Sequence, residues 1–211
     1  MAGEDWEMRV IADDQTVNAF IFPGGKVFVC SGLVRACRSE DALAAVLAHE
    51  IAHDVASHTA ERLSAAWVAN LTAGSLLFLA GALPGLALFS LWSVVGGFYV
   101  QDLLFQLPMS RKQESEADYI GLMLMAEACY DPRAAVPFWR LMETIERVGG
   151  TEVPEMISTH PSHAHRLDQI EGWLPEAMQK RSESDCSGTA AFADRFRKAM
   201  RWGKPIEAIQ V

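Results

Sequence analysis

The order of hydrophobic and polar positions predicts a short β-structure at the start of the chain. Three runs are typical of strands: Trp6–Ala12, Asn18–Phe22 and Lys26–Cys30. Gly24-Gly25 lies between the last two runs, and a pair of glycines between strands is a strong turn signal. We therefore expect a β-hairpin ahead of the helical part of the chain.

A long apolar helix is predicted directly after this hairpin. Ser39 is a suitable N-cap, and Glu40 and Asp41 bring negative charge to the first turn, where the helix dipole favours it. Apolar residues then occur nearly all round the helix, at Ala44, Ala45, Leu47, Ala48, Ile51 and Ala52. A helix without a polar face is expected to be buried.

Three further helices are predicted in the second half of the chain. The first is amphipathic and spans residues 111–128. The second starts at Asp131-Pro132 and ends before Gly149-Gly150, and the third spans residues 165–178. These elements predict a mainly α fold with a small N-terminal β-sheet, an α+β class.

Between the apolar helix and these later helices lies a segment without charge. Leu63–Gln101 contains 39 residues and no charged side chain. A single bilayer span needs only about 20 apolar residues, and Pro84-Gly85 divides the run near its middle. We expect residues 63–105 to form an apolar helical hairpin that dips into a membrane. The alternative is a pair of helices packed on the domain or in a homo-oligomer.

Composition and charge narrow the classes of protein. The chain has 211 residues, half of them hydrophobic, so residues 1–182 are expected to form one domain and residues 183–211 a peripheral tail. A net charge of −9 argues against nucleic acid as a partner and against docking on anionic lipid by charge alone. The polar, acidic start carries no signal peptide, so we expect either a cytosolic chain or, the alternative we favour, a piece cut from a longer precursor.

The predicted apolar helix carries the residues with the clearest chemistry. His49-Glu50-Ile-Ala-His53 is an HExxH sequence, in which two histidines one helical turn apart face the same metal ion. Glu50 then stands beside the open position of the metal. The sequence therefore predicts one Zn²⁺ per chain and hydrolytic chemistry. The alternative, a chance spacing of two ordinary histidines, we consider much weaker.

The third ligand of this zinc ion has to come from elsewhere in the chain. The metzincin pattern fails, because Ala56 and Thr59 stand where that pattern has glycine and histidine. If the helix continued unbroken, His58 would lie about 140° around it from His53 and face away from the metal. We therefore interpret His58 as a structural or surface histidine.

A later helix offers carboxylates with suitable spacing. Glu114 and Asp118 are four residues apart and lie on one helix face, whereas Glu116 points elsewhere. Glu114 can ligate zinc, and Asp118 can accept the second N–H of a ligand histidine and fix its tautomer. Acidic pairs of this spacing are usually solvated surface, so the prediction depends on their combination with HExxH.

Several motifs together resemble a known family over residues 6–174. They are Asn18-Ala-Phe20, the Gly24-Gly25 hairpin, HEIAH, Glu114-Ser-Glu-Ala-Asp118, and His160-Pro161 followed by Arg166. The chain resembles the membrane-associated zinc metallopeptidases that include the CAAX prenyl protease and the bacterial peptidase HtpX. The segments Ser110-Arg-Lys and Ser158-Thr-His-Pro-Ser-His163 are similar to the Oma1-like branch of the mitochondrial inner membrane.

The resemblance implies a zincin fold of the gluzincin type and roles for single residues. Glu114 is implied as the third zinc ligand, and Asp118 as the carboxylate behind a ligand histidine. Zinc lowers the pKa of its water and polarises the scissile carbonyl, while Glu50 takes the proton of that water. His160 and Arg166 are then candidates to stabilise the oxyanion. The implied substrate-binding edge strand comprises Asn18, Ala19 and Phe20.

The resemblance also implies a location and substrates. It predicts a metalloendopeptidase on the intermembrane-space side of the mitochondrial inner membrane, with a targeting sequence and anchor upstream of the present residues. Its substrates would be membrane-associated proteins processed under stress or in quality control, including the dynamin-like GTPase of inner-membrane fusion. Because this compartment permits disulfides, Cys129 and Cys186 are a candidate pair that ties the tail to the helices.

Two other classes of protein compete with this prediction. A catalytically silent, zinc-stabilised membrane adaptor would keep His49, His53 and Glu114 but has no need of Glu50. A helical membrane-interaction module without metal would leave all four residues unexplained. The sequence therefore favours the peptidase.

Overall fold

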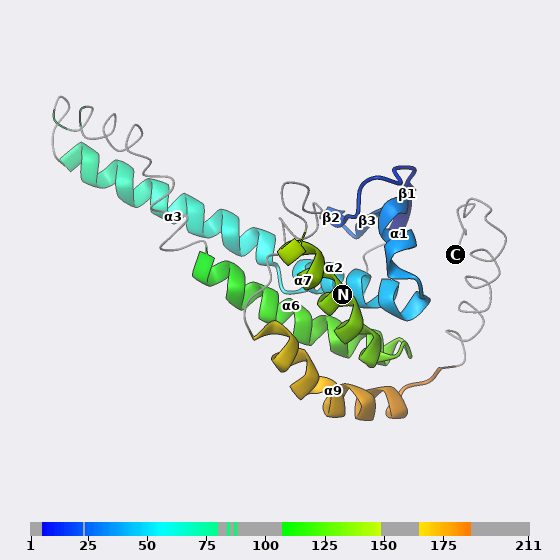
Figure 1. The fold of residues 1–211 in the computed structure, drawn as a ribbon. Coiled ribbons are helices and arrows are strands. Elements are labelled where there is room, and N and C mark those ends of the chain that lie inside the picture. Colours follow the sequence, from blue (N-terminus) through cyan, green and yellow to red (C-terminus); the bar gives the residue numbers. More distant parts are fainter. Residues whose placement is uncertain are drawn as a thin grey trace. The chain divides into compact units, whose positions relative to one another are not determined.

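The structure is a computed structural model, and it describes residues 6–22, 24–79, 84, 87, 107–148 and 165–186. The chain divides into two compact units (Figure 1). One unit comprises Met1–Asp54 and Ser115–Val211, and the other comprises Val55–Glu114. Helices predominate in the described residues and one small sheet accompanies them, so the expected α+β class is confirmed.

The small sheet contains three strands in the order β1-β3-β2. Strands β2 (Ala19–Phe22) and β3 (Lys26–Cys30) pair antiparallel, which confirms the hairpin. Gly24 and Gly25 between them have φ angles of 89° and 73°, in the left-handed region that glycine adopts without steric cost. Strand β1 (Glu7–Ile11) pairs parallel to β3, a pairing that the sequence pattern did not predict.

Two helices follow the sheet: α1 (Ser31–Cys37) and α2 (Glu40–Val55). The predicted cap of α2 is present, since the Ala42 backbone N–H donates to Ser39 Oγ at 3.2 Å. None of the residues from Asp41 to Val55 is exposed, so the expected burial of this helix is confirmed. The HExxH residues therefore lie on a helix whose residues are all buried or half-buried.

The later helices lie close to their expected positions. Helix α6 (Leu107–Glu127) begins four residues before the predicted start, and a 3₁₀ turn, η2 (Pro132–Ala134), precedes α7 (Ala135–Val148). The expectation for the last helix was too short. Helix α9 spans Arg166–Glu183, because the residues after Met178 have high helix propensity.

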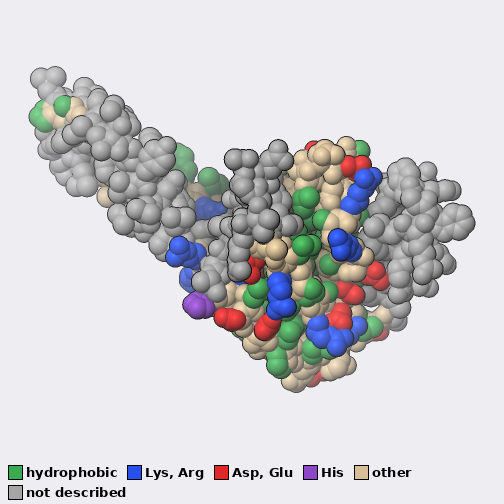
Figure 2. Space-filling view, viewed as in Figure 1, with side chains coloured by type: hydrophobic (Ala, Val, Ile, Leu, Met, Phe, Trp, Pro, Cys, Tyr) green, Lys and Arg blue, Asp and Glu red, His purple; other side chains and the backbone are tan. Residues whose placement is uncertain are grey.

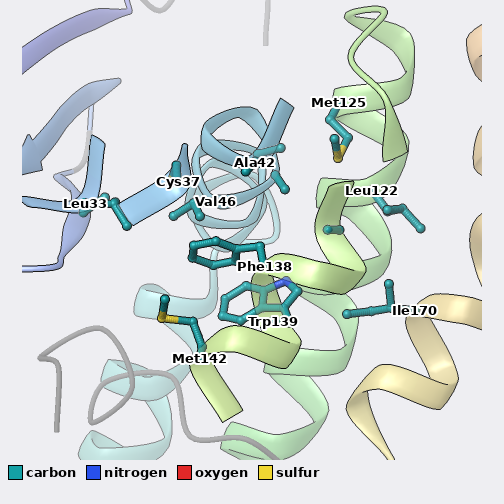
Figure 3. Close-up of a cluster of buried hydrophobic side chains, with 14 of the residues drawn as sticks. Leu33, Cys37, Ala42, Val46, Leu122, Met125, Phe138, Trp139, Met142 and Ile170 are labelled. Atoms are coloured by element: carbon teal, nitrogen blue, oxygen red, sulfur yellow. The ribbon is translucent and has the colours of Figure 1, made fainter. Parts of the chain in front are cut away.

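The core of this unit forms where α2, α6, α7 and α9 meet (Figure 3). Helix α7 contributes one buried face with the helical spacing i, i+3, i+4 and i+7, formed by Ala135, Phe138, Trp139 and Met142. Side chains from the other helices pack against it, among them Val46, Leu122, Met125 and Ile170. This core fixes α2 and α6, the two helices that carry the candidate metal ligands.

The surface of the described residues is mixed in charge. On the face drawn in Figure 2, acidic and basic side chains lie close to one another across the unit that contains the sheet. Ion pairs on the surface include Arg140 with Glu171 at 3.0 Å and Lys180 with Glu127 at 3.1 Å. Neighbouring charges of both signs are typical of a solvated surface and do not indicate a binding site. We therefore look for the functional site among the buried polar groups.

The second unit contains α3 (His58–Leu79), which covers the first part of the apolar segment. Most of the remaining segment, including its expected second arm, lies outside the described residues, so the hairpin stays a prediction. Among the described residues no helix is long and apolar enough to span a membrane.

The structure corrects the argument about His58. Helix α2 ends at Val55, Ser57 has a φ angle of 57°, and His58 begins α3. His58 is therefore not on the HExxH helix, because the left-handed residue before it breaks that helix. It is buried, at 2% exposure, and the interpretation as a structural histidine holds for this different reason.

A disulfide joins Cys129 and Cys186, as the sequence analysis expected. Cys129 follows α6 and Cys186 follows α9, so the bond fastens the end of one helix to the end of the other within one unit. The Arg181 side chain donates to the Cys129 carbonyl at 3.1 Å beside it. Most of the tail beyond Cys186 lies outside the described residues.

Candidate metal centre

Helix α2 brings the two histidines of HExxH together. Their Nε2 atoms are 3.2 Å apart, and the rings meet edge to face with centroids 4.8 Å apart. His49 is buried, at 1% exposure, and His53 is half-buried. Two nitrogens bound to one tetrahedral zinc at about 2.0–2.1 Å would lie roughly 3.3 Å apart. The observed spacing therefore fits two ligands of one zinc ion.

Helix α6 supplies the third side chain of the group. One ligand atom from each of His49, His53 and Glu114 lies within 4.8 Å of the other two, and no other such group occurs among the described residues. Glu114 is fully buried, at 0% exposure. It ends the second unit, but Ser115 continues the same helix into the unit that contains the histidines. These three residues could hold a metal ion.

The chemistry of the donors matches zinc more closely than calcium or magnesium. Two imidazoles and one carboxylate are a common catalytic zinc set, whereas calcium and magnesium prefer oxygen ligands. The two cysteines outside the disulfide, Cys30 and Cys37, are both buried and are not part of the group. Burial raises the pKa of the Cys37 thiol to about 12, so this group stays protonated and does not compete for a metal.

Asp118 lies behind the first histidine, as the sequence predicted. Its Oδ1 is 3.0 Å from His49 Nδ1, and both side chains are buried. With Nδ1–H donating to the carboxylate, His49 keeps a lone pair on Nε2, the atom that faces His53. Burial raises the pKa of Asp118, but the charge of Arg166 and the contact with His49 outweigh it, and the net pKa is lowered.

Arg166 is buried and reaches the same carboxylate. Its guanidinium donates to Asp118 Oδ1 at 2.7 Å and lies 3.5 Å from the centre of the Trp139 ring. Trp139 also meets His49 edge to face, with centroids 5.1 Å apart. Asp118 thus lies between a histidine and an arginine, and one tryptophan contacts both. No pattern in the sequence indicated this role of Trp139.

The two other glutamates of the motifs differ as expected. Glu50 is 5% exposed on the helix that carries the histidines. Glu116 is exposed, which agrees with its prediction on the side of α6 away from Glu114. Buried carboxylates are uncommon without a partner or a ligand, so the burial of Glu50 and Glu114 separates them from ordinary surface acids.

The expected substrate-binding residues lie at the edge of the sheet. Ala19 and Phe20 begin β2, which pairs only with β3 in the described sheet, and Asn18 directly precedes it. Asn18 and Ala19 are buried, at 5% and 2% exposure, while Phe20 stacks on Phe28 with centroids 5.3 Å apart. The edge position agrees with the expectation. His160, a candidate for stabilising the oxyanion, lies outside the described residues.

Sequence reasoning missed a polar group beside Glu114. Arg62 approaches Glu114 Oε1 at 3.8 Å, and Gln113 hydrogen-bonds both Arg62 and Glu61. Arg62 lies 52 positions before Glu114, and no short motif links them. The one signal was a charged pair, Glu61-Arg62, directly before a chargeless run.

Comparison with known proteins identifies the family. The sequence profile of peptidase family M48 matches residues 1–174. The chain belongs to peptidase family M48. It is 47% identical over 186 residues to "Mitochondrial metalloendopeptidase OMA1" of Schizosaccharomyces pombe, a match that covers 88% of this chain and 52% of that protein.

Two further relatives carry the same name. The protein of Saccharomyces cerevisiae is 38% identical, with 92% of this chain and 54% of that protein covered. The human protein, "Metalloendopeptidase OMA1, mitochondrial", is 36% identical, with 86% and 35% covered. The chain therefore spans about half the length of the fungal relatives. The expected resemblance is confirmed, and the M48 family and these names imply zinc at the group of His49, His53 and Glu114.

The M48 site depends on a very close approach of α6 to α2 at Gly121. A Cβ atom at this position would lie 2.9 Å from the His49 backbone nitrogen and 3.0 Å from the Ala48 carbonyl carbon. Because both atoms belong to the backbone, only a shift of one helix could relieve the contact. Gly172, in α9, has no atom within 4 Å of the same added carbon and is a matched control.

We expect Gly121→Ala to lower the free energy of unfolding by about 1–3 kcal/mol, because overpacking forces the helices apart. Gly172→Ala should be neutral or stabilise by up to about 1 kcal/mol, since alanine favours helix. Urea unfolding of the full chain, followed by circular dichroism, measures both. Equal stability of the two variants would contradict the close approach.

Proposed function

We propose that this chain is the catalytic part of a zinc-dependent metalloendopeptidase that cleaves peptide bonds of membrane-associated proteins. The observation that carries the proposal is the buried group of His49, His53 and Glu114 with Glu50 on the same helix as the histidines. The names of the relatives support the activity, and the donor set supports zinc. We assign His49, His53 and Glu114 as the three ligands.

The mechanism follows from the side chains around this group. Zinc, when bound, would polarise the scissile carbonyl and favour ionisation of water. Glu50 accepts the proton of the attacking water and passes it to the leaving amine. Asp118 keeps the His49 proton on Nδ1, which leaves Nε2 for the metal. His160 and Arg166 are the proposed donors to the oxyanion, and Arg166 also holds Asp118 in place.

The substrate is proposed to bind along β2. An extended peptide can add to an exposed sheet edge through main-chain hydrogen bonds, which recognise backbone more than side chains. Asn18 Oδ1 is buried and accepts no hydrogen bond from the described residues, so it can accept one from a peptide N–H. Such binding needs an unfolded or flexible segment in the substrate.

We further propose that the protein works in mitochondria, on the intermembrane-space side of the inner membrane, in stress-induced processing and quality control. The relatives are named as mitochondrial proteins. The Cys129–Cys186 disulfide supports an oxidising compartment, because cytosolic thiols are kept reduced. The dynamin-like GTPase of inner-membrane fusion is the candidate substrate.

The first test compares Glu50→Gln with the wild type. The variant should keep one zinc per chain but cleave an unfolded protein at least about 100-fold more slowly, because the general base is lost. Glu116→Gln, at an exposed position of α6, is the control and should cleave normally. Zinc content and gel-based cleavage of casein and of the membrane-anchored GTPase are the measurements.

These outcomes separate the peptidase from its rivals. Stoichiometric zinc without cleavage by the wild type would favour the silent adaptor. A wild-type chain that binds no zinc would rule out both the peptidase and the adaptor. Cleavage of casein but not of the GTPase would keep the activity and remove that candidate substrate.

The link to membranes is supported by the surface of α3. Large apolar side chains are exposed along one side of this helix, with 59–69% exposure at Leu63, Trp67, Val68 and Leu71. Three of its hydroxyls are satisfied internally, since Ser64, Thr72 and Ser75 each donate to the carbonyl four residues earlier. Hydroxyls bonded in this way cost little in an apolar environment. We propose that this side of α3 enters a bilayer.

Partition into vesicles tests this surface. We expect Trp67→Ser with Leu71→Ser to weaken binding to neutral phosphatidylcholine vesicles at least about tenfold, because each side chain loses apolar burial. Neutral lipid is suitable because the net charge is −9. Leu141→Ser, at a 38% exposed position of α7, is the control. Co-sedimentation that is equal for the wild type and both variants would contradict membrane insertion of α3.

A further inference from the structure

A chain of three hydrogen-bonded side chains leads to Glu114 within the second unit. Gln113 lies at its centre and is 2% exposed. Its Oε1 accepts from Arg62 Nε at 2.7 Å, and its Nε2 donates to Glu61 Oε2 at 2.8 Å. Glu61 and Arg62 belong to α3, whereas Gln113 and Glu114 are consecutive residues of α6.

The chemistry of the partners fixes the direction of this chain. A guanidinium only donates and a carboxylate only accepts, so the Gln113 amide can satisfy both neighbours in one orientation alone. A flipped amide would set donor against donor and acceptor against acceptor. The buried glutamine therefore holds the Arg62 guanidinium at a defined position instead of leaving it to sample solvent.

This position directs the guanidinium at the carboxylate of Glu114. Arg62 Nη2 is 3.8 Å from Glu114 Oε1, within ion-pair distance but beyond a hydrogen bond. The same nitrogen is buried and makes no hydrogen bond to the described residues. The Arg62 side chain is 41% exposed as a whole, so other atoms of it meet solvent while this nitrogen is buried.

A glutamate ligand benefits from such a neighbour. When a carboxylate binds zinc through one oxygen, the other oxygen is left to interact with a donor, and that interaction sets the rotation of the group. Asp118 performs this task for His49 through Nδ1. Arg62 is the cation at the corresponding place for Glu114.

We propose that Arg62, held by Gln113, is a positioning residue that orients Glu114 as a zinc ligand. The inference rests on the proposed zinc function of the chain. Arg62 acts through Glu114 and does not itself touch zinc or substrate. Removal of Arg62 should therefore weaken zinc binding more than it lowers the stability of the fold.

The test is the zinc dissociation constant of the full, metal-free chain, measured by competition with a chromogenic zinc chelator. Arg62→Ala should weaken zinc binding about 10–100-fold, the usual effect of removing a partner of a metal ligand. Arg62→Lys should fall between Arg62→Ala and the wild type, because lysine keeps the charge but cannot face Gln113 and Glu114 together. Gln113→Ala should weaken binding less than Arg62→Ala.

Arg140→Ala is the matched control, because it removes an arginine whose ion pair with Glu171 lies on the surface. It should leave zinc affinity within about twofold of the wild type. Circular dichroism of each metal-free variant sets a temperature at which all are folded. If Arg62→Ala is not folded at any temperature, the zinc dissociation constant of Arg62→Lys tests the positioning role instead.

A zinc dissociation constant of Arg62→Ala within twofold of the wild type would overturn the positioning role. A lower unfolding midpoint with unchanged zinc affinity would do the same, since it would show a structural contact only. A wild-type chain that binds no zinc would instead overturn the proposed function. The two failures are therefore distinguishable.

Discussion

The close packing of α6 against α2 is the constraint on which the metal centre depends. The two helices lie so close at Gly121 that a Cβ atom added there would be 2.9 Å from the His49 backbone nitrogen. Asp118 lies three residues before Gly121 and meets His49 Nδ1 at 3.0 Å. Glu114, one further turn along the same helix, joins His49 and His53 within 4.8 Å. The absence of a side chain at Gly121 thus allows the short separation of α6 and α2. The distances from Asp118 and Glu114 to the histidines depend on that separation.

Around this contact, the buried charges of Asp118 and Arg166 have partners of opposite sign. Asp118 lies between His49 and Arg166, and Trp139 covers the guanidinium at 3.5 Å. An isolated buried charge costs several kcal/mol, so the partners are a condition for keeping these acids ionised inside the protein. The arginine and the tryptophan come from α9 and α7, which the apolar core fixes against α6 and α2. Packing and electrostatics therefore depend on one another in this unit.

Local patterns were sufficient for much of this arrangement. HExxH, the Ser39 cap and the spacing of Glu114 and Asp118 are short-range features, because a helix converts sequence spacing directly into a shared face. Long-range features had no such signal. The parallel pairing of β1, the contact of Trp139 and the approach of Arg62 to Glu114 each join residues far apart in sequence. The left-handed Ser57 also ended α2 before His58, where helix propensity alone gave no reason for a break.

Zinc K-edge X-ray absorption of the zinc-loaded chain tests the central claim most directly. The account predicts four nitrogen or oxygen neighbours at about 2.0–2.1 Å and outer-shell scattering from two imidazoles. One imidazole should disappear from the spectrum of His53→Ala. A sulfur neighbour at about 2.3 Å, or a spectrum of His53→Ala identical to that of the wild type, would contradict a site built from His49, His53 and Glu114.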